Sequence, residues 1–320
     1  MASGKKKRPI RVGIIGCGDL SARHFRAAQE APEVKLVACC DRDKGKARAA
    51  AAKYGCRAFR SYRRMIRWCR LDAVHICLPY YQHTVTVGYS LSKKLHVLSE
   101  KPMAATPGEA DRLVSLAKKV GKTYSIVLRY RNGAPARLVR EALETGRLGK
   151  LFSVRATLAV PADDCESHGK EGGRILFDEA VHVLDLFGSI LGSEALSAFC
   201  TLLRRGEEWV GTTNRGPFFY EDGAHYSFYC VKSRSDEEPI EIRLTCERGE
   251  AVLTRERAKI TYYSRAAETA TEKKAAIYPR LVGQFYRACL GGAEPEVSGA
   301  DVLAAHRLAF RLCEDTGKEI

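Results

Sequence analysis

The sequence predicts a two-part α/β protein in which a doubly wound parallel sheet is followed by an α+β domain with a large, mainly antiparallel open sheet. Three observations predict it. Up to about residue 123, short β-branched runs alternate with helical segments, which is typical of parallel strands with helices on both faces. The first run ends in a glycine-rich turn. After residue 150, alternating segments follow one another with short turns, which favours antiparallel pairing.

The first part contains five predicted strands and four predicted helices. Continuous apolar runs predict strands at residues 10–15, 34–40, 74–78, 95–98 and 123–128. Helical spacing predicts helices at residues 19–30, 44–54, 84–92 and 107–120. Gly121 directly follows the last of these helices, in the position of a typical C-cap.

The second part has a different order of elements. Helices are predicted at residues 136–144 and 175–191, and two more close the chain at 279–290 and 300–314. Strands are predicted at residues 151–160, 196–203, 224–231, 240–246, 251–254 and 259–263. A chain of 320 residues suits about two domains of ~150 residues each. We therefore expect one domain over residues 1–123 and a second over residues 124–320.

The chain is strongly basic, with a formal net charge of +15. The charge is spread along the sequence apart from Lys5–Arg8 and residues 60–70, whereas a nucleic-acid binder gathers it on one face. We therefore expect no nucleic-acid partner. A positive field would speed the capture of an anionic small molecule, such as a sugar phosphate or a nucleotide sugar. A basic proteome or a need for solubility is the alternative explanation.

The N-terminus resembles a signal peptide only superficially. An apolar stretch follows Lys5–Arg8, but Arg11 and three glycines interrupt it and no small-residue cleavage site follows. No apolar run approaches the ~18 residues that span a bilayer. The 12 cysteines are scattered without a C-x-x-C pair, which fits buried thiols in a reducing cytosol. We expect a cytoplasmic protein with neither a metal site nor a membrane partner.

A glycine-rich segment joins the first strand to the first helix. Gly16 permits the tight turn, and Gly18, which has no Cβ, lets a pyrophosphate approach the backbone. Ser21 is small enough for the helix to pack close to the strand. The helix N-terminus offers N–H groups and a positive dipole end to the phosphates. Because the segment lies between a strand and a helix, it predicts a Rossmann dinucleotide-binding loop. The predicted contacts within it are Gly16, Cys17, Gly18, Asp19 and Leu20.

Asp41 ends the second strand and is predicted to contact the adenosine ribose. A carboxylate there accepts hydrogen bonds from the ribose hydroxyls and repels a 2′-phosphate, which favours NAD. Arg42 weakens this preference for NAD, because a guanidinium can stack on adenine or pair with that phosphate. We expect NAD as cofactor, with NADP as the alternative. The structural alternative for Asp41 is a helix N-cap or turn residue.

A second cluster of polar residues follows two later strands. Leu78 and Pro79 end one strand with His83 just beyond, and Glu100, Lys101 and Pro102 follow the next. The carboxyl edge of a parallel sheet is where ligands bind in such folds. Lys101, held extended before a proline, is therefore expected to face the cofactor crevice and to stabilise a developing alkoxide. A solvated charge is the alternative for an isolated lysine.

Several stretches together resemble the glucose–fructose oxidoreductase, inositol dehydrogenase and rhizopine catabolism family. They lie in family order between residues 12 and 192 and read VGIIGCGDLSARH, VHICLPYYQHTVTV, HVLSEKPMAATPGEADRL, RNGAPARLVREALETGRLGKLFSV and GGRILFDEAVHVLDLFGSILG. The EKP triplet and the D-x-x-x-H helix are the most specific of these marks. The rest of the chain matches only in general pattern.

The resemblance implies site residues, a peptide geometry and an assembly. Lys101 aligns with the active-site lysine, and Lys101–Pro102 is expected to be a cis peptide. Asp178 and His182 are implied to be catalytic residues facing the substrate, and Tyr130 and Arg131 match a segment that often lines the substrate site. Dimers or tetramers formed through the open sheet are usual in relatives, so a homodimer or homotetramer is expected.

Helical spacing supports the assignment of Asp178 and His182 independently. The two residues are i and i+4 on a predicted helix and so share one face, with Asp185 three residues further on. A histidine with an ordinary pKa near ~6.5 suits proton transfer at neutral pH. The alternative is an amphipathic helix with a merely hydrated polar face.

The sequence thus predicts an NAD(P)-dependent dehydrogenase or reductase that acts on CH–OH groups. It would transfer a hydride between nicotinamide and a secondary alcohol or ketone of a sugar, sugar derivative or inositol. One alternative is a nucleotide-binding sensor or regulator without turnover on the same fold. Another is a reductase of a non-sugar substrate. Both Lys101 and His182 are present, which favours the enzyme.

Overall fold

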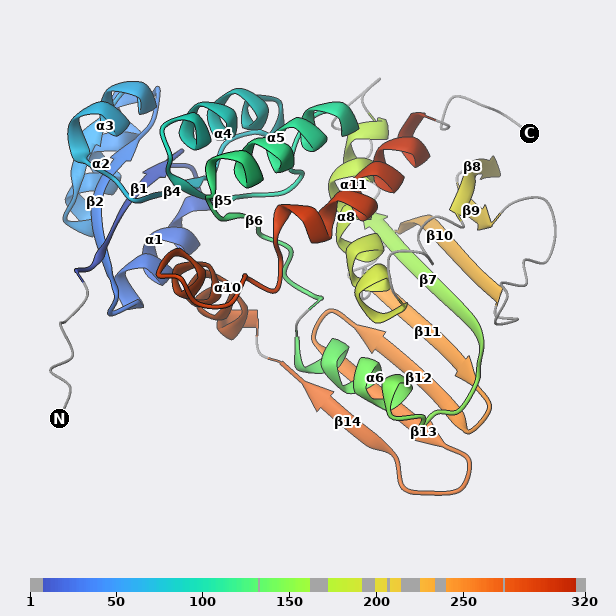
Figure 1. Ribbon diagram of the computed structural model, residues 1–320. Coiled ribbons are helices and arrows are strands. Elements are labelled where there is room, and N and C mark those ends of the chain that lie inside the picture. Colours follow the sequence, from blue (N-terminus) through green and yellow to red (C-terminus); the bar gives the residue numbers. More distant parts are fainter. Residues whose placement is uncertain are drawn as a thin grey trace, which may run out of the picture. The chain divides into compact units, whose positions relative to one another are not determined.

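A computed structural model describes residues 8–131, 133–161, 172–191, 199–205, 208–213, 225–233, 240–272 and 274–314 (Figure 1). The chain divides into two compact units. Met1–Val127 and Ala275–Asp301 form the first, and Leu128–Lys274 and Val302–Ile320 form the second. The predicted domain boundary after residue 123 stays a prediction. The two units are not separated at one position in the sequence, because Ala275–Asp301 belongs to the first unit.

The first unit contains a six-stranded parallel sheet in the order β3-β2-β1-β4-β5-β6. Its strands are β1 (Ile10–Ile15), β2 (Val34–Cys40), β3 (Arg57–Phe59), β4 (Ala73–Ile76), β5 (His96–Ser99) and β6 (Tyr124–Ile126). The central strands β1 and β4 are almost entirely buried, which explains their continuous apolar sequences. The strand order reverses between β1 and β4, so the loops after these two strands flank the crevice where ligands bind in such sheets.

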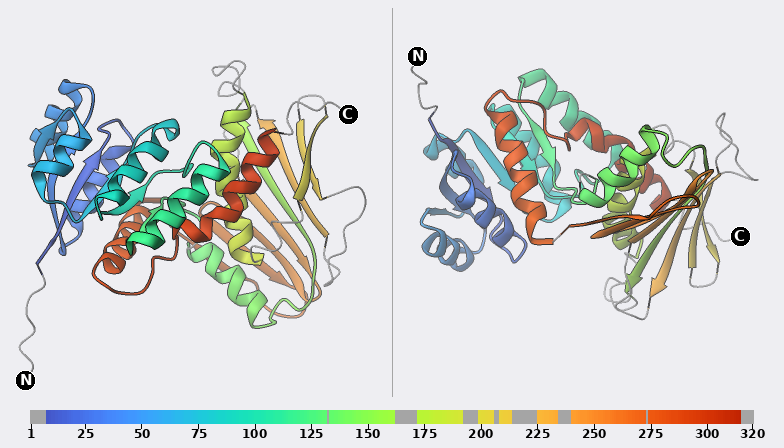
Figure 2. Two further views of the ribbon diagram at one scale, coloured as in Figure 1. Left: turned by 45° about the horizontal axis from the view of Figure 1, so that its top comes forward. Right: turned by 90° about the horizontal axis from the view of Figure 1, so that it is seen from below.

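Helices connect these strands and cover the sheet (Figures 1 and 2). They are α1 (Ser21–Glu30), α2 (Lys44–Tyr54), α3 (Tyr62–Cys69), α4 (His83–Ser92) and α5 (Pro107–Val120), with a short 3-10 turn at Tyr80–Gln82. Local chemistry sets their ends. Asp43 caps α2 by accepting from the backbone N–H groups of Gly45 and Lys46, and Thr106 caps α5 in the same way. Gly121 ends α5 at φ 64°, as its position predicts.

The late segment of the first unit carries most of α10 (Lys274–Cys289). Its aromatic side chains Tyr278, Phe285 and Tyr286 are buried. Tyr286 stacks on His75 of β4, and Tyr278 lies edge-on to His24 of α1. This helix therefore completes the hydrophobic core of the first unit, although most of the second unit lies between it and β6 in the sequence.

The second unit contains an eight-stranded sheet in the order β14-β13-β12-β11-β7-β10-β9-β8. Its strands are β7 (Leu151–Pro161), β8 (Phe199–Arg205), β9 (Glu208–Thr213), β10 (His225–Ser233), β11 (Ile240–Cys246), β12 (Gly249–Thr254), β13 (Arg257–Tyr262) and β14 (Glu268–Thr271). Only β7 and β10 pair in parallel; the other described pairs are antiparallel. The large, mainly antiparallel sheet is therefore confirmed.

Helices α6 (Ala134–Glu144) and α8 (Gly172–Leu191) pack against each other and against this sheet, and α11 (Gly299–Glu314) continues from the first unit into the second. Burial alternates along β11 to β13, so that Ile242, Leu253 and Ile260 are buried. The opposite positions carry polar residues such as Arg243 and Lys259. One face of these strands thus meets the core and the other is polar.

Most predicted elements are confirmed, with shifts of a few residues at their ends. The predictions missed β3, α3, β9 and β14. Three of these are strands of six residues or fewer, and α3 lies in the basic segment after residue 60. Within the described part of the chain, no helix has both the length and the apolar character needed to cross a bilayer. The same residues contain no group of three or more His, Cys, Asp or Glu side chains placed to hold a metal ion.

Candidate functional site

The two glycines of the loop after β1 are required for different reasons. Gly16 is buried at φ +97°, and a Cβ there would collide with the carbonyl oxygen of Cys77 in the loop after β4. Packing within the protein therefore explains Gly16. Gly18 is exposed, and a Cβ there would meet no atom within 4 Å. No described neighbour requires this glycine, so a ligand that approaches the backbone is the better explanation.

The N-terminus of α1 is open to an anion. Its N-cap residue is Leu20, no side chain caps the helix, and its first turn contains no acidic residue. Asp19 and Leu20 are exposed, whereas Ser21 is buried and donates from its hydroxyl to the carbonyl oxygen of Gly18. The N–H groups of Ser21, Ala22 and Arg23 donate to the carbonyl oxygens of the turn before the helix, so it is the positive end of the helix dipole that this turn presents to a phosphate.

Asp41 holds the glycine loop to the end of β2. One of its carboxylate oxygens accepts from the backbone N–H of Cys17 (2.8 Å), and the other accepts from that of Asp43 (2.9 Å). The helix cap is Asp43, so Asp41 is not the cap, but its bond from the N–H two residues on is the turn contact that the structural alternative expected. Each carboxylate oxygen accepts more than one hydrogen bond. The half-buried side chain therefore keeps the capacity to accept ribose hydroxyls.

An arginine cluster lies beside the end of β2. Arg42, Arg60 and Arg64 line an open hollow of about 600 Å³ together with Asp43. All three arginines are exposed. The carboxylate of Asp43 is already used by the backbone N–H groups at the start of α2. The hollow therefore presents guanidinium groups to an anion, and Arg42 was the only one of them predicted from the sequence.

His83 ties together the loops after β4 and β5. Its ring is fully buried, and its two nitrogens lie 2.7 Å from the carbonyl oxygens of Leu78 and Pro102. Carbonyl oxygens only accept and a neutral imidazole has one N–H, so a neutral ring donates to one of these two oxygens and contacts the other. Pro79, next to Leu78, is exposed. The described contacts of His83 thus position the two loops rather than reach toward open space.

Lys101 lies on the loop after β5, at the carboxyl edge of the sheet. The Lys101–Pro102 peptide is cis, as the family resemblance implied. Lys101 is half-buried, Pro102 is buried, and the preceding Glu100 is 4% exposed. The backbone N–H of Glu100 donates to the carbonyl oxygen of Ile76 on β4 (3.0 Å). Strands β1, β4 and β5 are neighbours, so the loops with Gly16, Leu78 and Lys101 follow adjacent parallel strands.

A buried chain of polar side chains ends at Glu100. Tyr286 contacts Nε2 of His75 (2.9 Å), the Nδ1 atoms of His75 and His24 are 3.1 Å apart, and Nε2 of His24 is 3.0 Å from a Glu100 oxygen. The hydroxyl of Tyr278 donates to the same oxygen of Glu100 (2.7 Å). These residues come from α1, β4, the loop after β5 and α10.

The protonation states of this chain follow from burial and contacts. Burial lowers the pKa of His75 well below its usual value, and the nearby His24 lowers it further. Burial alone would raise the pKa of Glu100, but hydrogen bonds from His24 and Tyr278 and the charge of Lys101 lower it. An ionised carboxylate only accepts, so Nε2 of His24 and the hydroxyl of Tyr278 both donate to Glu100. The ionised carboxylate of Glu100 therefore immediately precedes Lys101 in the loop after β5.

The second unit brings together part of the predicted substrate site. The rings of Tyr130 and His182 meet edge-to-face at 5.3 Å between centroids, and both residues are buried. Nε of Arg131 lies 3.4 Å from a carboxylate oxygen of Asp185, which is 1% exposed. Tyr130 and Arg131 thus lie along the His182–Asp185 face of α8. Asp178 lies one turn earlier in α8, but its side chain is outside the described residues.

The sequence did not reveal several residues of this arrangement. His24, His75 and Tyr278 meet only because α1, β4 and α10 pack together, and no spacing in the chain connects them. Arg60 and Arg64 are part of the basic segment noted above. The fold brings them into one hollow with Asp43, so the sequence predicted only the sign of their charge.

The curated proteins that are similar in sequence include two with named sugar substrates. A dTDP-3,4-didehydro-2,6-dideoxy-alpha-D-glucose 3-reductase from Streptomyces violaceoruber is 32% identical over 58% of this chain and 56% of its own. A D-glucoside 3-dehydrogenase from Escherichia coli (strain K12) is 30% identical over 62% of this chain and 58% of its own. The chain thus spans little more than half the length of these relatives.

Solved structures of other proteins are similar over nearly the whole fold. The WlbA dehydrogenase from Bordetella pertussis, solved in complex with NADH and UDP-GlcNAcA, matches with a TM-score of 0.75 and 22% identity over 97% of both chains. At this identity the likeness shows the fold.

Two family models account for most of the chain. Residues 10–128 match the model described as "Oxidoreductase family, NAD-binding Rossmann fold", and residues 136–252 match the "GFO/IDH/MocA C-terminal domain". The first match contains the glycine loop and Lys101, and the second contains α8. The chain belongs to the glucose–fructose oxidoreductase, inositol dehydrogenase and rhizopine catabolism family of oxidoreductases.

Proposed function

We propose that the protein is an NAD(P)-dependent oxidoreductase that acts on a secondary alcohol or ketone of a sugar, sugar derivative or inositol. One observation carries this proposal. A dinucleotide loop in which a Cβ at Gly18 would meet no protein atom lies at the same sheet edge as Lys101, and Lys101 follows the buried carboxylate of Glu100 on a loop that His83 contacts. A dinucleotide-binding loop beside a lysine suits hydride transfer to or from a carbon that bears oxygen, because the lysine can stabilise negative charge on that oxygen.

The residues of the first unit fit a nicotinamide dinucleotide. Gly16, Cys17, Gly18, Asp19 and Leu20, with the open N-terminus of α1, would hold the pyrophosphate. Asp41 would accept the adenosine ribose hydroxyls, and the loops at Leu78, Pro79 and Glu100–Lys101 would border the nicotinamide. The dinucleotide supplies the hydride acceptor or donor when it is bound.

We propose that Lys101 donates a hydrogen bond to the substrate oxygen and stabilises the negative charge that develops on it. His182 would accept the hydroxyl proton in the oxidation direction and return it in reduction. Asp178 would orient either the substrate or the imidazole. Tyr130 and Arg131 would line the substrate side, since they lie along the face of α8 that carries His182.

The cofactor choice rests on two opposing features. The carboxylate of Asp41 favours NAD, as it repels a 2′-phosphate. Arg42, Arg60 and Arg64 offer that phosphate a cationic hollow. We propose NAD as the cofactor with NADP accepted as well, because the arginines stand beside the carboxylate rather than in its place.

The substrate is proposed to carry a negative charge, as in a sugar phosphate or a nucleotide sugar. The net charge of +15 would favour its capture. Similarity to a reductase of a dTDP-linked sugar also supports an anionic substrate.

The polar outer face of β11 to β13 is the proposed contact between copies of the chain in a homodimer or homotetramer. Light scattering on the purified protein tests this assembly.

The decisive experiment measures turnover in single variants. The wild-type protein is screened with NAD(H) and NADP(H) against sugars, sugar phosphates and nucleotide sugars, and the best substrate is carried to Lys101→Ala, His182→Ala and the control Lys119→Ala. Lys119 is an exposed residue of α5. We expect kcat to fall by about 10²-fold or more in the first two variants and to be unchanged in the third. Full turnover in Lys101→Ala would refute the proposed role, and dinucleotide binding without turnover on any substrate would favour the sensor.

A further inference from the structure

A basic cavity lies at the amino-terminal edge of the first sheet, opposite the glycine loop. It has a volume of about 460 Å³ and is bordered by the starts of β1 and β5, the end of α4 and the end of α10. The glycine loop follows the carboxyl end of β1. Because parallel strands point the same way, this cavity and the dinucleotide loop lie at opposite edges of one sheet.

The charges around the cavity are mainly positive. Its lining includes Arg8, Lys93, Lys94 and Lys122, and the acid among the lining residues is Asp72. Both carboxylate oxygens of Asp72 accept from Arg8 (2.8 and 3.0 Å), and one also accepts from the backbone N–H of Arg11 (2.9 Å). The acid is thus neutralised by Arg8, which leaves the three lysines uncompensated by Asp72.

His96 faces the cavity as a hydrogen-bond donor. The backbone N–H of Thr123 donates to its Nδ1 (3.1 Å). Burial lowers the pKa of His96 to about 4, and Lys122 contributes to the same shift. A neutral ring that accepts at Nδ1 carries its proton on Nε2. The described backbone therefore fixes the tautomer of His96.

Lys122 and His96 form a pair of donors. Nζ of Lys122 lies 3.2 Å from Nε2 of His96. An ammonium group has no acceptor, so neither atom can accept from the other. An acceptor shared by both would satisfy the pair, and an anionic oxygen would do so best.

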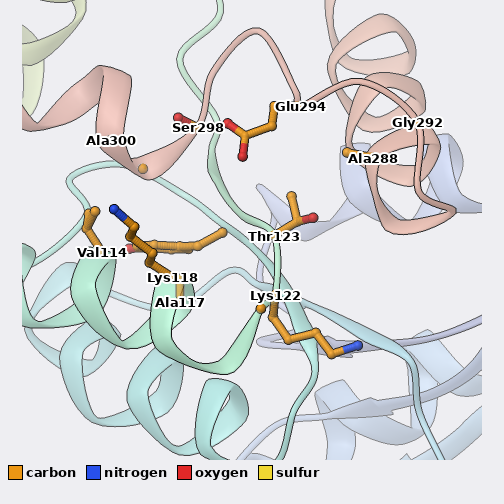
Figure 3. A pocket seen from close by; sticks show the side chains of 13 residues that line it. Val114, Ala117, Lys118, Lys122, Thr123, Ala288, Gly292, Glu294, Ser298 and Ala300 are labelled. Atoms are coloured by element: carbon orange, nitrogen blue, oxygen red, sulfur yellow. The ribbon is translucent and has the colours of Figure 1, made fainter.

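The neighbouring cavity lacks this character. It has about 470 Å³ and is lined by Lys118, Lys122, Tyr124, Glu294 and Ser298 together with smaller residues, so Lys122 borders both cavities. Figure 3 shows that the side chain of Lys122 extends away from Lys118 and Glu294. Glu294 offsets one of the two lysine charges there, and Lys118 does not line the first cavity, so Lys118 provides a matched control.

We infer that the cavity bordered by Lys93, Lys94, His96 and Lys122 binds the phosphate group of a small phosphorylated metabolite, at a site separate from the dinucleotide. A phosphate dianion offers several oxygens, which can accept from the fixed pair and from the two exposed lysines together. The volume of the cavity also accommodates the rest of a small ligand. This inference does not depend on the proposed enzymatic activity.

The test is calorimetric titration of inorganic phosphate into the whole protein with the dinucleotide loop saturated by NAD or NADP. We expect binding at one site, weakened about tenfold or more in Lys122→Gln, the effect of losing one charge-assisted hydrogen bond. Lys118→Gln is expected to bind within twofold of wild type. A second variant combines Lys93→Gln with Lys94→Asn, since asparagine tolerates the φ of 58° at Lys94, and should weaken binding as well.

A parallel titration with a hexose 6-phosphate shows whether the site prefers a phosphate monoester or inorganic phosphate. Tighter binding than inorganic phosphate supports a phosphate monoester, and equal binding supports phosphate itself. The Nε2 resonance of ¹⁵N-labelled His96 should move on addition of either ligand. Absence of binding with the loop saturated would overturn the inference. So would binding that is equal in wild type, Lys122→Gln and the Lys93/Lys94 double variant.

Discussion

Tyr278→Phe isolates the hydrogen bond that α10 donates to Glu100. The hydroxyl lies 2.7 Å from a carboxylate oxygen, and both residues are buried. Phenylalanine keeps the ring and its edge-on contact with His24, so the substitution opens no large cavity. A hydrogen bond to a charged group contributes about 1.5–3 kcal/mol. We therefore expect the free energy of unfolding to fall by about 2 kcal/mol at pH 7.

The pH dependence distinguishes this bond from simple packing. The pKa of Glu100 is lower in the folded protein than in the unfolded chain. Stability from its ionised form is therefore present above the unfolded pKa and is lost as pH falls through the folded pKa. Tyr278→Phe removes one group that lowers this pKa. The difference between variant and wild type should accordingly shrink as the carboxyl group is protonated, whereas a packing effect would not change.

The assay is chemical denaturation at pH 7 and at several values down to about pH 3.5, around the carboxyl range. Tyr124→Phe is the matched control, since Tyr124 is also buried but donates to the neutral carbonyl oxygen of Met103 (3.3 Å). Its smaller loss, about 1 kcal/mol, should not vary with pH. A loss below about 0.5 kcal/mol in Tyr278→Phe, or one that is equal at every pH, would refute the assigned ionised Glu100.

Three further predictions test the loops. Gly16→Ala should lower the free energy of unfolding by several kcal/mol or prevent folding, because a left-handed φ and the Cys77 carbonyl both oppose a Cβ. Gly18→Ala should keep that free energy within about 0.5 kcal/mol of wild type but weaken dinucleotide binding. Thermal denaturation measures the first effect and calorimetry the second. His83→Phe should reduce kcat without matching loss of dinucleotide affinity, because the loop of Lys101 loses its tether; unchanged kinetics would contradict this. Arg64→Glu should weaken NADP binding about tenfold or more and leave NAD binding within twofold; equal effects on both would remove the arginine from 2′-phosphate recognition.

The parallel sheet was predictable because its signals are local. The strands β1 and β2 were predicted with their observed bounds, since each is a continuous apolar run closed by glycine or aspartate. The helix α5 was predicted equally well from Pro107 and Gly121 at its ends. Strand β3 was missed because only three residues pair, and two of them are exposed. A pattern that short carries no hydrophobic period.

The site was predictable only where one residue type is required by local geometry. Gly16 and the residues around Lys101 follow directly after strands, so sequence position alone places them at the sheet edge. Asp41 follows β2 as predicted and its bond from Asp43 fits the turn alternative, but its bond from Cys17 was not foreseen. The bond from Cys17 arises from the register of β1 against β2, whereas the bond from Asp43 is a local turn contact two residues along the chain.

The buried polar chain behind Lys101 shows why the remainder required three dimensions. Glu100 is adjacent to Lys101 in sequence, yet its ionised state depends on His24 from α1 and Tyr278 from α10, which is 178 positions away. A buried carboxylate is costly unless such partners are present. The late segment that joins the first unit is therefore more than a packing element. It supplies a donor that keeps a negative charge beneath the loop of the proposed active-site lysine, so substitutions in α10 should act on the chemistry at β5.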